Sequence, residues 1–148
     1  MGLEIVGWRE WVSLPSLGIA RIKAKVDSGA RTSTLHAYDI ETYFDRGEEF
    51  VRFKVHYLQN NDNVFAESVA RVVEHRIVKS SSGHESNRPV IDTQIHFLNQ
   101  AWNLEITLVG REQMGFRMLI GREALRGRFL IDPNLSYVGG RLSKKKKH

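Results

Sequence analysis

The chain has 148 residues, a formal net charge of +5 and no cysteine. This length suits one domain with a substantial core, and the 41% hydrophobic and 26% charged residues are typical of a globular protein. The absence of cysteine excludes disulfides, thiolate zinc sites and a cysteine nucleophile. The sequence shows no secretion signal and no apolar run of membrane-spanning length, so we expect a cytoplasmic protein with no membrane partner.

Much of the positive charge lies at the C-terminus, in the run Lys144–Lys147. The rest of the chain is close to neutral. We therefore expect one domain over residues 1–140, followed by a basic, disordered tail over residues 141–148. Such a tail attracts any polyanion electrostatically, so it predicts no specific nucleic-acid partner.

Most of the remaining sequence alternates between apolar and polar residues, as half-buried β-strands do. Residues 19–26 (IARIKAKV) show this pattern clearly, with lysines or arginine at every second position from Arg21 to Lys25, and they end directly at Asp27. The predicted strands are residues 8–14, 19–26, 50–58, 69–78, 90–98, 102–109, 116–120 and 129–131.

Three segments are predicted to interrupt these strands. Residues 59–63 (QNNDN) predict a turn, and residues 79–89 (KSSSGHESNRP) predict a loop or hairpin tip, because they are polar and, in the second case, contain glycine. Residues 122–126 predict one short helix, which ends at Gly127. The fold is therefore expected to be mostly β, with a short helix near the C-terminus.

Two short motifs bear on function. Residues 27–30 (Asp-Ser-Gly-Ala) follow a predicted strand, and because Asp, Ser and Gly are all common in turns, a plain β-turn explains them as well as a catalytic carboxylate does. Residues 118–122 (MLIGR) favour the catalytic interpretation. They form an apolar strand that leads through Gly-Arg into the predicted helix.

Together these motifs resemble the retropepsin family of aspartic proteases, and their order is kept: KVDSGA, a polar segment where the flap is expected, then MLIGREAL. Over GWREWVSLP, AKVDSGARTSTLHA, VKSSSGHESNRPVI and IGREAL, the chain more closely resembles the bacterial RimK-associated retropepsin-like proteins, which carry the label of ATP-dependent zinc proteases. This resemblance extends from Gly7 to about Tyr137. It implies a pepsin-type single lobe, built as a closed β-barrel with one short C-terminal helix, and peptidase activity.

The chemistry of aspartic proteases adds an expectation about assembly. Two carboxylates share one proton around a water molecule, because two like charges so close together cannot both ionise. One acts as general base toward the water and the other as general acid toward the scissile carbonyl. The chain has a single Asp-Ser-Gly, so we expect a homodimer with Asp27 as the catalytic residue. The resemblance implies that Ser28 braces the paired loops and that Gly29 lets them approach closely. It gives structural roles at the site to Ala30, Gly121, Arg122 and Glu123.

One position departs from the viral retropepsins. There the second residue after the catalytic glycine is usually acidic and pairs with the arginine of the Gly-Arg motif, whereas here it is Arg31. Arg31 either pairs with Glu123, the neighbour of Arg122, or points into the cleft as a substrate ligand.

The flap region suggests a class of substrate. Residues 76–88 contain Arg76, Lys79 and Arg88 against a single acid, Glu85. Arginine binds carboxylates in bidentate geometry, and RimK is a ligase that adds glutamates to the C-terminus of a ribosomal protein. We therefore predict that Arg31, Arg76, Lys79 and Arg88 bind an acidic peptide, such as a glutamate-rich tail. The alternative is that these cations are solvated or pair with Glu74, Glu85 and Glu123.

The zinc label finds no ligand motif in the sequence. There is no His-Glu-x-x-His, and His36, His75 and His84 meet only if the fold brings them together. There is also no phosphate-binding Gly-x-x-x-x-Gly-Lys-Ser/Thr loop, so we expect no cofactor. Ser33 and His36 lack the Gly-x-Ser-x-Gly setting of a serine nucleophile, which favours a plain strand or turn.

A second class of function remains open at this point. The chain is also compatible with a non-catalytic peptide-binding module that serves as an accessory to a glutamate ligase system. The intact Asp-Ser-Gly and Gly121-Arg122 favour the peptidase.

Overall fold

The β-strands account for most of the chain in the computed structural model, which describes residues 3–58, 64–79, 82–110 and 115–140. In chain order the elements are β1 (Glu4–Val6), β2 (Arg9–Leu14), the 3-10 helix η1 (Pro15–Leu17), β3 (Ile19–Val26), β4 (Ser33–His36), β5 (Tyr38–Asp45), β6 (Glu48–Val55), β7 (Ala66–Lys79), β8 (Glu85–Phe97), β9 (Gln100–Val109), β10 (Met118–Ile120), α1 (Arg122–Leu125) and β11 (Phe129–Ile131).

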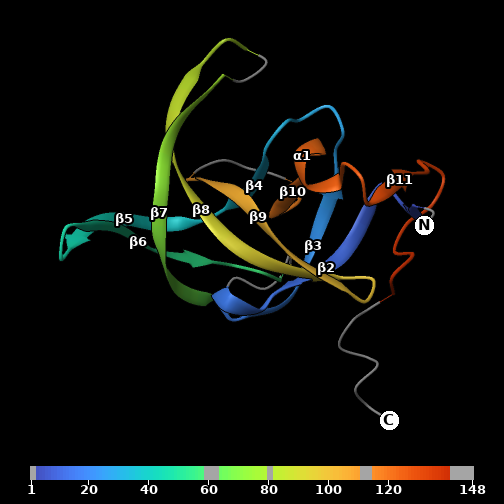
Figure 1. Ribbon diagram of the computed structural model, residues 1–148, viewed down its shortest axis with the longest axis horizontal. Coiled ribbons are helices and arrows are strands. Elements are labelled where there is room, and N and C mark those ends of the chain that lie inside the picture. The colour runs from blue at the N-terminus through green and yellow to red at the C-terminus, as the bar shows by residue number, and fades with distance from the viewer. Residues whose placement is uncertain (1–2, 59–63, 80–81, 111–114, 141–148) are drawn as a thin grey trace.

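The larger sheet closes on itself. Its strand order is β2-β3-β10-β4-β9-β8-β7-β6-β5, and Ser13 of β2 also pairs with His96 of β8. The strands from β2 to β8 in this order therefore form a ring, which Figure 1 shows around the centre of the molecule. The expected mostly-β fold with one short α-helix is confirmed.

Parallel pairing positions the two sequence motifs side by side. β10 pairs with β3 in parallel, with Ile120 opposite Val26, and β4 pairs with β9 in parallel. Because parallel strands end at the same edge of a sheet, the residues that follow β3 and β10 are neighbours. These residues are Asp27 and Gly121, so the fold brings the Asp-Ser-Gly loop against the Gly-Arg turn.

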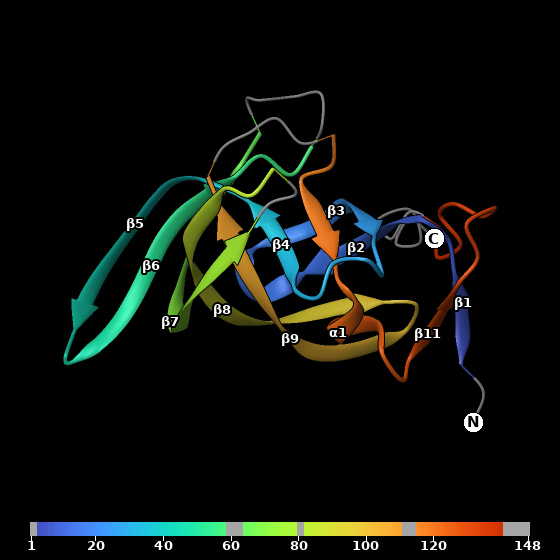
Figure 2. The ribbon, with the colours of Figure 1, turned by 90° about the horizontal axis from the view of Figure 1, so that it is seen from above.

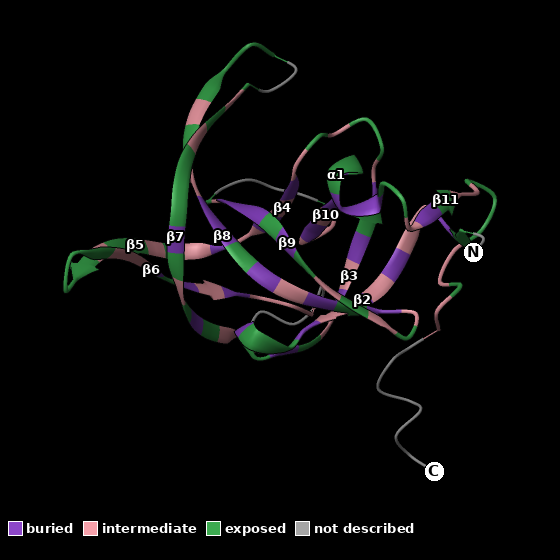
Figure 3. Ribbon diagram, in the orientation of Figure 1, coloured by how far each residue is buried: buried purple, intermediate pink, exposed green. Residues whose placement is uncertain are grey.

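The core lies inside this ring of strands. Alternate residues of β3, among them Ile22 and Ala24, are fully buried, as the period-two pattern predicted. The largest buried side chains come from every strand of the ring and include Leu14, Leu35, Ile91, Ile95, Ile106 and Met118. Figure 3 shows that burial falls toward the tips of the β5–β6 and β7–β8 hairpins, which project from the body.

One buried acid holds the C-terminal segment onto the ring. Glu10 of β2 is fully buried, and its carboxylate accepts hydrogen bonds from the backbone N–H groups of Gly7 (2.7 Å), Val138 (3.0 Å) and Gly139 (3.1 Å). These bonds replace the water that the charge loses on burial. The segment that ends the described chain therefore lies along β2.

Several boundaries differ from the sequence-based expectation. Residues 79–89, predicted as a loop or hairpin tip, do belong to a hairpin, but the loop is shorter than predicted, because Lys79 is in β7 and residues 85–89 are in β8, with Glu85 opposite Lys79. Both faces of this projecting hairpin are largely exposed, so its strands carry polar residues on both sides. They therefore lack the alternation of apolar and polar residues by which a half-buried strand is recognised, and they resemble a loop in sequence. The strands β1, β4 and β5 and the helix η1 were not predicted. The predicted turn at 59–63, residues 80–81 of the flap tip and the tail at 141–148 lie outside the described residues.

The two ends of the molecule are formed by different elements. Figure 2 shows the β5–β6 hairpin extending from one end, while the separate two-stranded sheet of β1 and β11 lies at the other. In the part of the chain that the structure describes, no helix is long and apolar enough to cross a membrane.

Candidate active site

The Asp-Ser-Gly-Ala loop begins where β3 ends. The backbone N–H of Asp27 donates to Ile120 O at 2.9 Å, which extends the β3–β10 pairing by one residue. The loop then turns, with Ala30 N–H donating to Asp27 O at 3.2 Å and Gly29 N–H donating to the carboxylate Oδ1 of Asp27 at 2.9 Å. The β-turn interpretation and the catalytic interpretation are therefore compatible, because Asp27 belongs to a turn whatever its chemical role. The turn holds a partly exposed carboxylate at the end of a rigid strand.

The Gly-Arg motif clamps this loop. Arg122 N–H donates to Ala30 O at 2.8 Å, and its guanidinium Nη1 lies 3.4 Å from the carbonyl oxygens of both Ser28 and Gly29. A side chain at Gly121 is impossible without movement, because a Cβ there would lie 2.7 Å from the carbonyl carbon of Thr32. The positions predicted to be structural at the site are therefore in contact with the Asp27 loop.

Ser33 has a positioning role that sequence analysis missed. It is 2% exposed, and its hydroxyl accepts a hydrogen bond from Gly121 N–H at 3.0 Å. A hydroxyl so buried and bound to the Gly-Arg turn supports the plain-strand interpretation of Ser33. The sequence contains no signal for this contact, because Ser33 and Gly121 come together only through the pairing of β4 with β10.

Arg31 and Glu123 form the reversed pair considered above. Arg31 Nε lies 3.9 Å from Glu123 Oε2, and Glu123 N–H donates to Arg31 O at 3.2 Å. The side chains are 76% and 49% exposed, so the ion pair contributes little to stability. The backbone hydrogen bond, rather than the charge pair, ties α1 to this loop.

Two of the three flap cations, Arg76 and Lys79, have carboxylate partners within the chain. Arg76 donates to Glu105 at 2.9 Å and to Glu74, and these bonds, the one to Glu105 first, raise the pKa of Arg76 above its ordinary value. Lys79 Nζ lies 3.8 Å from Glu85. The excess positive charge counted over residues 76–88 is therefore offset in the folded chain, partly by acids outside that stretch. Substrate binding by Arg76 and Lys79 stays a prediction.

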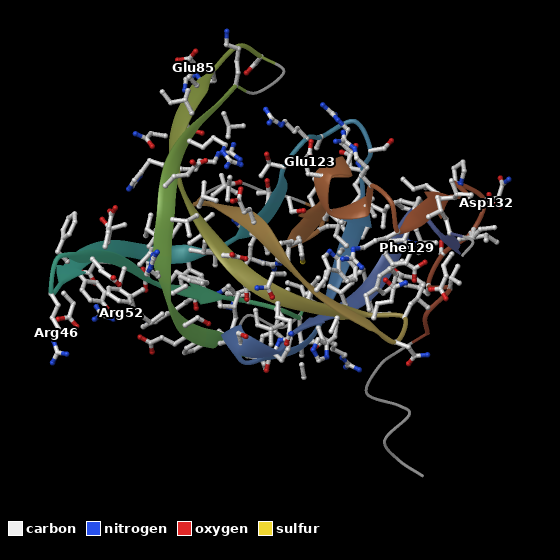
Figure 4. The ribbon with its side chains drawn as sticks, viewed as in Figure 1. Arg46, Arg52, Glu85, Glu123, Phe129 and Asp132 are labelled. Atoms are coloured by element: carbon white, nitrogen blue, oxygen red, sulfur yellow. The ribbon has the colours of Figure 1, made fainter. Side chains whose placement is uncertain are left out.

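The predicted substrate residues do not all converge. Arg31 and Arg76 share the lining of a cavity of about 480 Å³ between β9, α1 and the residues before β4. Arg88 lines a different cavity of about 580 Å³ beside β9, where its Nε donates to Ser86 Oγ at 2.9 Å. Figure 4 shows Glu85, the partner of Lys79, near the end of the β7–β8 hairpin and Glu123 on α1.

The residues present do not fit a zinc site. Among the described residues, no group of three or more His, Asp or Glu side chains is placed to hold a metal ion. His75 Nε2 lies 3.0 Å from both carboxylate oxygens of Glu49 on β6. The imidazole of His56 stacks on Tyr38 at a centroid distance of 4.3 Å. No chemical step is therefore assigned to a metal.

The ring of strands, the Asp-Ser-Gly loop and the Gly-Arg clamp together define a retropepsin-like lobe. The family described as RimB-like, retropepsin-like aspartic endopeptidase RimB, matches residues 5–141, and the chain belongs to this family. A crystal structure of a Legionella pneumophila protein of unknown function is similar in fold, with a TM-score of 0.76 and 22% identity over 93% of this chain and 99% of that one.

Longer relatives contain a similar segment. A probable alpha-L-glutamate ligase of Desulfotalea psychrophila is 46% identical over 141 residues, and one of Shewanella pealeana is 43% identical over 136 residues. The matches cover 95% and 92% of this chain. The chain spans about 30% of the length of these curated relatives.

Proposed function

We propose that this protein is an aspartic-type peptidase in which Asp27 activates water for hydrolysis of a peptide bond. The observation that carries the proposal is the fixed carboxylate at the end of β3. Gly29 N–H binds its Oδ1, and the Gly121-Arg122 turn holds the loop from behind. The carboxylate remains partly exposed, so water and substrate can reach it.

The second carboxylate would come from another copy of the chain. In such a homodimer one Asp27 takes a proton from the water, while the other, protonated, donates to the scissile carbonyl oxygen. Ser28 and Gly29 are exposed, as a contact with a second loop requires. Within one chain, the nearest atom to a Cβ at Gly29 would be Asp27 Oδ1 at 3.2 Å. The absence of a side chain there leaves room for the partner loop.

We propose an acidic peptide as substrate, such as a glutamate-rich tail. Two observations support this substrate: the matched relatives are described as probable glutamate ligases, and Arg31 and Arg88 each line a cavity. A cytoplasmic location fits such a substrate and is part of the same proposal.

The test compares wild type with Asp27→Asn, which is nearly isosteric. The wild type is expected to cleave oligo-glutamate faster than neutral peptides of equal length, and Asp27→Asn is expected to lose activity while it keeps the melting temperature. Cleavage should survive EDTA. Activity that EDTA removes and zinc restores would show that the aspartic mechanism is wrong.

A second candidate is a non-catalytic peptide-binding accessory to a glutamate ligase. It is favoured by the match to part of proteins described as ligases. Under this alternative the wild type binds oligo-glutamate without cleaving it, and Asp27→Asn binds equally well.

Light scattering tests the proposed homodimer separately. An active enzyme that is strictly monomeric would contradict a catalytic site shared between two chains.

A further inference from the structure

A row of basic side chains leads along β3 to Asp27. Ile22, Ala24 and Val26 are buried in the core, so strand alternation places Lys23 and Lys25 together on the other face. The hydrogen bond from Asp27 N–H to Ile120 O continues the pairing by one residue, so the same alternation places Asp27 next to Lys25 on that face. Successive side chains on one face of a strand are roughly 6.8 Å apart. Lys25 is thus the first side chain beyond the candidate catalytic carboxylate, and Lys23 is the second.

The neighbouring strand adds an arginine to this row. β2 pairs with β3 in antiparallel register, with Arg9 opposite Lys25, and opposed residues point to the same face. The Arg9 guanidinium lies 4.6 Å from the ring centroid of Trp8 and 4.9 Å from that of Tyr137. Arg9 Nε donates to Ser136 Oγ at 3.1 Å. These contacts hold Arg9 in one position and leave its terminal nitrogens for a ligand.

We name Arg9, Lys23 and Lys25 the basic row. Lys23 Nζ is also braced by aromatic rings, 5.4 Å from the centroid of Trp11 and 5.9 Å from that of Tyr137. Across the described part of the chain, no carboxylate lies within ion-pair distance of these three side chains. Arg31, Arg76 and Lys79, by contrast, all have such partners. Glu10, the sequence neighbour of Arg9, is buried and bound by backbone N–H groups, and the acid that follows Lys25 is Asp27, the candidate catalytic residue itself.

Two like charges directly opposite each other on adjacent strands destabilise a sheet, so Arg9 facing Lys25 is unfavourable for folding alone. A ligand with negative charge would remove this repulsion. Because the row is in line with Asp27, such a ligand would reach the candidate catalytic carboxylate.

We infer that the basic row binds the acidic side chains of an extended peptide substrate on one side of the scissile bond. This inference rests on the proposed peptidase function and assigns its specificity to residues outside the flap. In an extended peptide, alternate side chains also repeat at roughly 6.8 Å, so acids at every second position match Lys25 and Lys23 in register. Arg9 can bind the carboxylate nearest Asp27 with two nitrogens.

The experiment measures peptide binding in the Asp27→Asn protein, so that cleavage plays no part. Two labelled peptides have the same numbers of glutamates and alanines. In the alternating peptide every second residue is glutamate, and in the block peptide all glutamates precede all alanines. The alternating peptide is expected to bind more tightly. Lys23→Gln and Lys25→Gln together should weaken its binding by about tenfold or more, as lost hydrogen bonds between charged groups predict. Lys23→Arg with Lys25→Arg should retain it.

Matched controls use cations at a distance from the row. Arg46→Gln and Arg71→Gln remove the same net charge from the β5–β6 hairpin turn and from β7, and Figure 4 places Arg46 at the far end of the molecule. These controls should change binding by less than about twofold at moderate salt, because distant exposed charges are screened. Unchanged melting temperatures would show that both pairs of substitutions leave the fold intact.

The inference is overturned if the lysine pair and the control pair have equal effects, if the block peptide binds as well as the alternating one, or if duplex RNA displaces the peptide at equal charge concentration. Cleavage by the wild type separates the two proposals. If the wild type cleaves acidic peptides but the lysine substitutions do not change binding, the peptidase proposal is supported and the role of the basic row is contradicted. If the lysine substitutions weaken binding but the wild type cleaves no peptide, the role of the basic row is supported and the catalytic proposal is contradicted.

Discussion

Gly121→Ala should disrupt the candidate site through the backbone. A Cβ at this position would lie 2.7 Å from the carbonyl carbon of Thr32 and 2.9 Å from the carbonyl oxygens of both Ala30 and Arg31. All three atoms belong to the main chain of the loop that carries Asp27, so no side chain can rotate away. Relief of the clash requires Gly121 and this loop to separate by roughly 0.8 Å or more, since packed carbon atoms sit about 3.5–4.0 Å apart.

The expected cost follows from this geometry. Overpacking typically destabilises by about 1–3 kcal/mol, and we expect the upper end because the movement also strains the hydrogen bonds from Gly121 N–H to Ser33 and from Arg122 N–H to Ala30. The reduced entropy of the unfolded chain offsets this by about 0.4–1 kcal/mol. For a chain of this size, a net loss of about 2 kcal/mol lowers the melting temperature by roughly 4–8 °C.

Two other glycines provide matched comparisons. At Gly115 a Cβ would meet none of the described atoms within 4 Å, so Gly115→Ala should leave the melting temperature unchanged or slightly higher. At Gly29 the only close contact is with Asp27 Oδ1, so Gly29→Ala should preserve folding of the single chain but reduce dimerisation and activity. Thermal unfolding followed by circular dichroism, with light scattering for assembly, measures all three. If Gly121→Ala melts within about 1 °C of Gly115→Ala, the clamp between the two motifs is not the constraint described here.

The buried acid and the flap ion pair give two further predictions. Glu10→Gln keeps one acceptor oxygen but loses the charge that binds three backbone N–H groups, so urea unfolding should show a loss of about 2 kcal/mol, and an equally stable variant would contradict the assigned role. Arg76→Gln leaves Glu74 and Glu105 facing each other without their cation, and because these acids are about half exposed the loss should be only about 0.5–1 kcal/mol. The raised pKa of Arg76 keeps it charged well above neutral pH, so this difference from wild type should persist to alkaline pH; a difference that disappears near neutral pH would contradict it.

The strands that border the core could be predicted from the sequence. In β3, β8, β9 and β11 one face or both are buried, and the apolar pattern records this directly. The strands missed by this rule were β5, which is mostly exposed, and β1 and β4, whose three and four residues are too few to show a period. The outer half of the β7–β8 hairpin was taken for a loop for the same reason, since hydrogen bonds between exposed strands leave no hydrophobic signature.

The candidate site shows a similar division. The Asp-Ser-Gly and Gly-Arg motifs could be recognised in the sequence because each depends on a few consecutive residues. The charge balance of the flap could not, because Arg76 pairs with Glu105, which is 29 residues away and comes close only through the pairing of β8 with β7 and β9. The position of Lys25 beside Asp27 was implicit in the alternation of β3, but only the three-dimensional structure shows that Lys25 forms no ion pair with the described residues.

The β-rich fold class, the family and the candidate catalytic carboxylate could be inferred from the amino-acid sequence, because these depend on local periodicity and on short runs of residues. Which cations are paired with acids and which lie beside Asp27 depends on the three-dimensional fold. Ion pairs join residues that are distant in the chain, and their partners are set by strand register rather than by sequence separation. Arg76 and Lys25 are both basic residues close to recognisable motifs, yet the fold surrounds the first with carboxylates and leaves the second next to Asp27.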